Sequence, residues 1–238
     1  MFIKLAEQLK ANPRTIVFTE GTDARILNAA DKLTNEGILG VILIGEEAEV
    51  KKAAQEGGFH IDKCQIVNPA DYGEMEAMVE EMVRLRKGKM TEEQVRSALA
   101  QGNYFGTMLV KMGKADCLLG GATYSTADTV RPALQLIKTK PGNKIVSSTF
   151  IMVKGDEKLA FADCAINIDP TEDDLVEIAI ESAKTAEVFG IDPKVAMLSY
   201  STLGSGKGDS VTKMANATAK VKELAPDLAI DGELQFDA

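Results

Sequence analysis

The chain has 238 residues, of which 45% are hydrophobic and 26% charged, as in ordinary globular proteins with one large or two modest domains. Its net charge of −9 argues against a protein that wraps nucleic acid or lies on an anionic membrane. No stretch is long and apolar enough to cross a bilayer, and the amphipathic N-terminus lacks the features of a secretory signal. We therefore expect a cytoplasmic protein.

The first half of the chain alternates short apolar runs with amphipathic patterns. The apolar runs predict strands within residues 14–20, 38–45, 64–69 and 116–121. The amphipathic patterns predict a helix at the N-terminus and further helices within residues 22–37, 46–58, 72–89, 91–102 and 102–115. Apolar strands separated by helices are typical of a parallel sheet that is covered by helices on both faces.

Short polar residues mark where these helices begin and end. Thr22 or Asp23 is suited to cap the first helix after the N-terminal one, and Gly37 is suited to end it. Thr91 and Gln94 have the spacing of a capping box, in which each side chain accepts a hydrogen bond from the other's backbone N–H. The helix within residues 91–102 is therefore expected to begin at this point.

The alternating pattern breaks at Pro141-Gly142, so we place a boundary between two domains near residue 142. Beyond it, the sequence predicts strands at 144–153 and 158–168, a helix at 171–190, a strand at 195–198 and a helix from residue 211. The fold class expected from these patterns is α/β, with two α/β/α domains and largely parallel sheets. Residues 1–142 would form the first domain and residues 143–238 the second.

A glycine-rich loop, "LSYSTLGSGKGDS" at residues 198–210, follows the predicted strand at 195–198 and precedes a helix, as phosphate-binding loops do. A P-loop needs a hydroxyl residue after its Gly-Lys pair to hold Mg²⁺, and here Gly208 follows Lys207. Ser201 stands where the first glycine of that motif belongs, so we reject an ATPase. An anion site with Ser201, Ser205 and Lys207 and a simple flexible turn remain equally consistent with the loop.

A second glycine-rich junction carries several hydroxyl groups and an arginine. A predicted strand ends at Gly120-Gly121, and hydroxyl residues and a cation then lead into a helix: Thr123, Ser125, Thr126, Thr129 and Arg131. Hydroxyls, free N–H groups and a guanidinium at one helix start favour an anion site. The alternative is that the hydroxyls only cap the helix and that Arg131 pairs with Asp128 or Glu172.

Histidine and cysteine are scarce. The one histidine, His60, follows a turn and has no neighbours suited to share a ligand, so we interpret it as a solvated or packing residue. Cys64, Cys117 and Cys164 are widely spaced beside apolar residues, which favours buried, reduced thiols. These counts leave no Ser-His triad and no His-based metal site, so we expect no metal. No residue pattern indicates a cofactor, and we expect none.

Several long segments closely resemble the phosphate acetyltransferase (phosphotransacetylase) family. They include "GGATYSTADTVRPALQLIKTKPG", "FADCAINIDPTEDDLVEIAIESAKTAEVFG", "PKVAMLSYSTLGSGKG" and "APDLAIDGELQFDA", in the family's order. The resemblance implies reversible conversion of acetyl-CoA and phosphate to acetyl phosphate and CoA. It also implies a metal-free ternary complex in a cleft between two α/β domains, with CoA as a substrate. More distant relatives are phosphate butyryltransferase and the C-terminal domain of large malic enzymes.

The resemblance also implies roles for individual residues. Arg131 is expected to bind an anionic part of the substrates, and Arg86 to contact CoA or phosphate. From the residues alone, Arg86 is better explained as a solvated helix end. The complete set of expected substrate-binding residues is Arg86, Ser125, Thr126, Thr129, Arg131, Ser201, Ser205 and Lys207. We further expect a homodimer that serves acetate metabolism.

The family continues beyond the last residues of this chain. Its next segment carries an Asn-Asp-Leu-Ser-Arg-Gly motif and an Asp, to which the resemblance assigns the acetyl phosphate contacts and the base for the CoA thiol. No catalytic residue is therefore assigned, and Asp128 and Asp209 are candidates by type only. We expect the second domain to be incomplete and residues 1–238 alone to be inactive. Phosphate butyryltransferase and a non-catalytic acyl-CoA-binding module remain the alternatives.

Overall fold

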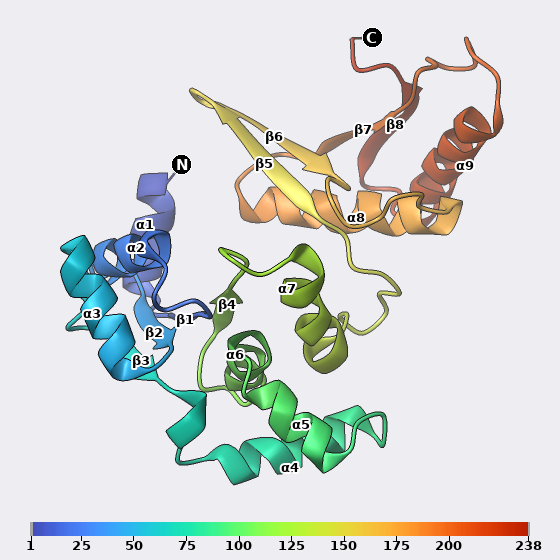
Figure 1. Ribbon diagram of the computed structural model, residues 1–238. Helices are drawn as coiled ribbons and strands as arrows, with labels where there is room; N and C mark the ends of the chain where they lie inside the picture. Colours follow the sequence, from blue (N-terminus) through green and yellow to red (C-terminus); the bar gives the residue numbers. More distant parts are fainter. Residues whose placement is uncertain (1, 238) are drawn as a thin grey trace. The chain divides into compact units, whose positions relative to one another are not determined.

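The computed structural model of the protein describes residues 2–237 and contains two compact units, Met1–Lys138 and Thr139–Ala238 (Figure 1). The sequence placed the domain boundary near residue 142, and the two units divide between Lys138 and Thr139. None of the helices in residues 2–237 combines the length and the apolar character that crossing a membrane requires.

The first unit is built on a parallel sheet with the strand order β3-β2-β1-β4. Its strands are β1 (Thr15–Phe18), β2 (Gly40–Ile44), β3 (Gln65–Val67) and β4 (Cys117–Leu119). β1 pairs with β2 and β4, β2 pairs with β3, and every pairing is parallel. The strands therefore lie where the apolar runs of the sequence predict them, and the parallel sheet is confirmed.

Helices and short helical turns connect and follow these strands. They are α1 (Phe2–Ala11), α2 (Ala24–Asn35), α3 (Glu47–Gly57), η1 (Pro69–Asp71), α4 (Met75–Arg86), α5 (Glu92–Leu99), α6 (Gly102–Lys111), α7 (Thr126–Pro132) and the π-helical turn η2 (Ala133–Ile137). Asp23, rather than Thr22, caps α2 by accepting the N–H of Arg25. Thr91 and Gln94 form the predicted capping box at α5.

The sheet of the first unit separates two apolar cores, because consecutive residues of a strand point to opposite faces. Val17, Ile42 and Ile44 lie in one core with side chains of α4, α5 and α6. Phe18 and Leu43 lie in the other core with side chains of α2 and α3, which cover the opposite face of the strands in Figure 1. The predicted three-layer α/β/α arrangement is thus present in this unit.

The second unit contains a β-hairpin, a pair of parallel strands and two long helices (Figure 1). Its elements are β5 (Thr149–Lys154), β6 (Glu157–Ala162), α8 (Glu172–Val188), β7 (Lys194–Leu198), α9 (Asp209–Leu224) and β8 (Ala229–Leu234). β5 and β6 pair antiparallel around the predicted turn at Gly155, whose φ of 61° suits glycine. The core joins both helices to the parallel pair through Val176, Ala179, Met197, Ala217, Val221 and Ile230.

Candidate functional site

The first predicted anion site begins just beyond the carboxyl end of β4. Ser125 caps α7: its hydroxyl accepts the N–H of Asp128 at 3.1 Å and donates to the Asp128 carboxylate at 2.7 Å. The Thr129 hydroxyl donates to the carbonyl of Ser125 at 3.0 Å, and Thr126 is exposed on the first turn. Arg131 lies on the last turn of the same short helix. The structure therefore gathers these four predicted residues on one helix.

Arg131 has one of the two partners that the sequence suggested for it. Its Nη1 lies 3.2 Å from Oδ1 of Asp128, whereas Glu172 pairs with Lys220 instead. The side chain of Arg131 is 53% exposed, so its ion pair with Asp128 lies in contact with water. Such exposed pairs contribute little stability, so a phosphate can compete with Asp128 for the guanidinium.

Arg86 ends α4 and lies against the segment that follows α7. Its Nη1 donates to the carbonyl of Gln135 in η2 at 3.3 Å. Its Nε is buried and has no hydrogen-bond partner among residues 2–237. Arg86 is therefore half-buried rather than the freely solvated helix end that its residue type alone suggests. Gln135 is also held by Tyr104, whose hydroxyl donates to Oε1 of Gln135 at 3.0 Å.

An internal carboxylate that the sequence analysis did not single out occupies the loop between β4 and α7. Glu20 follows Thr19, the first residue after β1. Its carboxylate accepts the backbone N–H groups of Thr123 at 2.8 Å and Gly121 at 3.2 Å. Burial raises the pKa of Glu20, but the N–H groups of Thr123, Tyr124 and Gly121 and the Thr19 hydroxyl outweigh it and lower the pKa overall. The carboxylate is therefore charged at neutral pH.

The second predicted anion loop, in the other unit, also surrounds a carboxylate of the protein. Ser201 is fully buried; its hydroxyl donates to Oε1 of Glu233 at 2.9 Å and accepts the N–H of Gly206 at 2.9 Å. Gly204 N–H donates to the same carboxylate oxygen at 2.6 Å. The N–H of Gly204 and the Ser201 hydroxyl lower the pKa of Glu233. In this arrangement Ser201 supports the loop and does not face solvent.

Of the three predicted site residues in this loop, Ser205 and Lys207 are exposed. The Ser205 hydroxyl oxygen accepts the N–H of Thr202 at 3.0 Å. The hydroxyl of Tyr200 donates to the carbonyl of Lys207 at 2.7 Å and fixes the backbone there. An anion that approaches the loop from solvent would therefore meet Ser205 and the Lys207 ammonium, in front of the α9 N-terminus.

Asp163 organises a third loop in a similar way. Its carboxylate accepts the N–H groups of Ala165 at 2.8 Å, Ile166 at 3.0 Å and Asn167 at 3.2 Å, as well as the hydroxyl of Ser148. Burial raises the pKa of Asp163, but these donors together hold it well below its usual range. Asp163 could not be singled out from the sequence, since nothing in the local pattern shows that N–H groups converge on it.

The histidine and cysteine residues supply no further chemistry in the described chain. The side chain of His60 is 79% exposed, with Nδ1 3.8 Å from Oδ2 of Asp31, which confirms its interpretation as a solvated residue. All three cysteines are free, and Cys64 and Cys164 are half-buried. The expectation of burial is wrong for Cys117, which is exposed on the same face of β4 as the exposed Leu119. Residues 2–237 contain no group of three or more His, Cys, Asp or Glu side chains suited to hold a metal ion.

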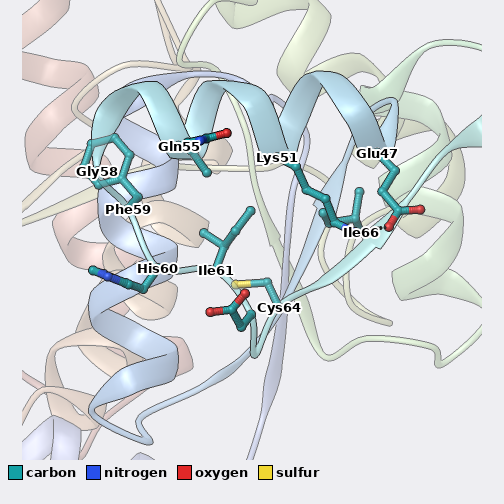
Figure 2. A pocket seen from close by; sticks show the side chains of 11 residues that line it. Glu47, Lys51, Gln55, Gly58, Phe59, His60, Ile61, Cys64 and Ile66 are labelled. Atoms are coloured by element: carbon teal, nitrogen blue, oxygen red, sulfur yellow. Dashed lines mark hydrogen bonds and ion pairs between the residues drawn. The ribbon is translucent and has the colours of Figure 1, made fainter.

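A hollow of about 730 Å³ lies beside α3 and the residues that lead into β3. Figure 2 shows Lys51 and Glu47 projecting from the helix along its rim, while Ile61 and Cys64 come from the segment below. None of the predicted substrate-binding residues lines this hollow, so it is separate from both loops described above.

Comparisons with known proteins agree on one family. Residues 1–238 match the family described as Phosphate acetyl/butaryl transferase. The chain is 53% identical to a phosphate acetyltransferase of Bacillus subtilis (strain 168), over 100% of this chain and 74% of that protein. A solved phosphotransacetylase from Streptococcus pyogenes superposes with a TM-score of 0.95 at 51% identity, covering 100% of this chain and 73% of that one. A phosphotransacetylase from Staphylococcus aureus gives a TM-score of 0.90 at 48% identity, over 98% and 72%.

Proposed function

Because the chain belongs to the phosphate acetyl/butaryl transferase family, we propose that it transfers an acetyl group between CoA and inorganic phosphate. The reaction is acetyl-CoA plus phosphate to acetyl phosphate plus CoA, in either direction. The observation that carries the proposal is the identity of 53% to a phosphate acetyltransferase over the whole of this chain. The structural match at a TM-score of 0.95 to a phosphotransacetylase supports it.

We assign the phosphate to the helix α7. In the direction of acetyl-CoA formation, the CoA sulfur attacks the acetyl carbon, the carbon–oxygen bond to phosphate breaks, and the thiol proton passes to a base. The leaving phosphate gains negative charge, which a guanidinium and hydroxyl donors can stabilise. Arg131 supplies the guanidinium and Thr126 an exposed hydroxyl on the same helix. The Ser125 and Thr129 hydroxyls would donate to phosphate by giving up their bonds to Asp128 and to the Ser125 carbonyl. No residue is assigned as the base.

Arg86, Ser205 and Lys207 are proposed to bind the remaining anionic groups, which include the phosphates of CoA. The unpartnered Nε of Arg86 supports this role, because a buried guanidinium nitrogen needs an acceptor. The exposed Lys207 ammonium in front of α9 supports a role in anion binding in the second unit. Ser201 contributes through Glu233, since its hydroxyl is already used inside the loop.

We also propose that no metal or cofactor takes part, that the protein acts in the cytoplasm in acetate metabolism and that it forms a homodimer. The free thiols suit a reducing compartment.

Exposed apolar side chains on the hairpin β5–β6, such as Phe150 and Phe161, give a dimer apolar surface to bury. Light scattering after size exclusion measures the mass in solution and so tests whether the protein is a dimer.

One assay tests the proposed reaction. Acetyl phosphate and CoA are mixed with the protein, and the thioester is followed by its absorbance, with butyryl phosphate and a chelator in parallel reactions. We expect turnover with acetyl phosphate that is faster than with butyryl phosphate and unchanged by the chelator. Binding of acetyl-CoA without turnover by the full-length protein would instead identify an acyl-CoA-binding module. A higher kcat/KM for butyryl phosphate would make it a butyryltransferase.

A further inference from the structure

Glu20 lies two residues beyond the end of β1, next to the glycine-rich loop between β4 and α7. β1 and β4 pair in parallel, with Phe18 opposite Leu119, so the residues beyond both strands meet at the same edge of the sheet. Glu20 is buried there, with 8% of its surface exposed, although a charged residue is seldom buried without partners. Its environment therefore needs a physical explanation.

Three of the five donors to the Glu20 carboxylate are N–H groups of the loop, and the other two are hydroxyls. Oε1 accepts the N–H groups of Thr123 at 2.8 Å, Gly121 at 3.2 Å and Tyr124 at 3.4 Å, and the hydroxyl of Thr123 at 3.3 Å. Oε2 accepts the hydroxyl of Thr19 at 2.9 Å. A carboxylate with this many donors is stable in a buried position, because each donor replaces a water.

The same stretch of chain also holds the carbonyl side of the loop. Nη2 of Arg25 donates to the carbonyl of Ala122 at 2.7 Å, while the guanidinium is itself fixed by Asp23. Residues 19–25 therefore hold the loop by hydrogen bonds to the N–H groups on either side of Ala122 and to the Ala122 carbonyl. The fit is close: a Cβ on Gly120 would lie 2.5 Å from the Thr19 hydroxyl oxygen, which requires glycine at that position.

Because the Glu20 carboxylate occupies the loop, the N–H groups of the loop do not themselves form a phosphate site. The N–H groups that would otherwise receive a phosphate are already occupied by a negative charge, and a second anion there would be repelled. The loop ends at Ser125, the residue that caps α7 and precedes Arg131 by less than two turns. We propose that Glu20 is a positioning residue, which fixes the loop and so holds Ser125 and Arg131 in place for a phosphate that displaces Asp128. Only the kinetic test of this proposal depends on the function proposed above.

Glu20→Gln is the central test, because it keeps the size of the side chain and removes the charge. An amide cannot satisfy all of these donors and turns its own NH₂ toward some of them, so the loop should loosen. Looser positioning weakens phosphate in the ground state and the transition state alike, which raises KM and leaves kcat nearly unchanged. We expect the KM for phosphate to rise about tenfold and the KM for acetyl-CoA to change less than about threefold.

The measurements are made on the full-length protein. Amide hydrogen exchange of the peptide spanning residues 119–126 reports the loop directly and is expected to accelerate in Glu20→Gln. Glu20→Ala empties the carboxylate position, so formate should slow exchange there and lower the KM for phosphate, whereas chloride at equal ionic strength should not. Val95→Ala, on the buried face of α5, serves as the control for lost stability, since the core that contains Val95 includes none of residues 119–126.

The outcomes separate the proposal from its alternatives. A KM for phosphate within about twofold of wild type in Glu20→Gln, or an equal rise in Val95→Ala, overturns the proposal. If the protein shows no acetyl transfer, the proposed function fails, and equilibrium binding of inorganic phosphate then takes the place of KM. A roughly tenfold weaker binding in Glu20→Gln still supports the positioning role, and unchanged binding overturns it.

Discussion

Ser201 and Glu233 are joined by a buried hydrogen bond in which the serine hydroxyl donates to Oε1 of the carboxylate at 2.9 Å. The same hydroxyl accepts the N–H of Gly206, and the same carboxylate accepts the N–H of Gly204. A loop whose composition suggests a phosphate cradle is thus closed around an anion that belongs to the protein. Ser201 is the residue that links the two sides of this closure.

Ser201→Ala is therefore expected to reduce stability. The substitution leaves the Gly206 N–H without its acceptor and removes one donor from Glu233, and an unsatisfied buried polar group costs about 1–3 kcal/mol. Urea unfolding of the full-length protein measures the change. The matched control is Ser205→Ala in the exposed part of the same loop, for which a change within about 0.5 kcal/mol is expected. Equal stability of the two variants would show that the Ser201–Glu233 bond contributes nothing.

The secondary structure follows from local physics, and this is why the sequence predicts it well. The strands around Val17 and Leu43 are short apolar runs, and both faces of the sheet are buried as such runs require. Thr91 and Gln94 lie within one helical turn, so their capping box is readable from spacing alone. The gathering of Ser125 and Arg131 on one helix is likewise a consequence of short spacing.

The occupants of the two glycine-rich loops could not be predicted in this way. Glu20 lies about a hundred residues before the loop that it fills, and Glu233 about thirty residues after its own. A local pattern shows that N–H groups will be free in a loop, but not which acceptor reaches them. The available signal for Glu20 was its place at the end of the strand predicted within residues 14–20, next to the strand end that carries Gly120.

Arg131→Lys tests the assignment of phosphate to α7. Lysine keeps the charge and loses the planar fork, so bidentate contacts worth about 1.5–3 kcal/mol should disappear. The affinity for phosphate should then fall about ten- to a hundredfold, measured as KM or by equilibrium binding. Arg84→Lys is the matched control, since Arg84 pairs with Glu81 on the surface of α4 and is not assigned to the site. Unchanged phosphate affinity in Arg131→Lys, with unchanged stability, would remove Arg131 from the site.

Asp128→Asn tests whether Asp128 competes with phosphate for Arg131. The exposed pair between them should be worth about 0.2–1 kcal/mol, so its removal should strengthen phosphate binding roughly 1.4- to fivefold. The gain should shrink as salt is raised, because both the pair and the phosphate contact are screened. A loss of turnover by orders of magnitude with phosphate binding intact would instead identify Asp128 as the base for the CoA thiol.

Asp163→Asn is expected to change how the stability of the protein depends on pH. The donors around Asp163 lower its pKa in the folded protein below the ordinary value of 3.8. Its stabilising contribution is therefore fully present above that pH and is lost as the pH falls toward the folded pKa. Wild type should be more stable than Asp163→Asn at pH 7, and the difference should shrink below about pH 4. Urea unfolding from neutral to acidic pH measures this, with Asp156→Asn on the exposed hairpin turn as the control. A difference that stays constant down to acidic pH would show that the loss in Asp163→Asn does not arise from the charge of the carboxylate.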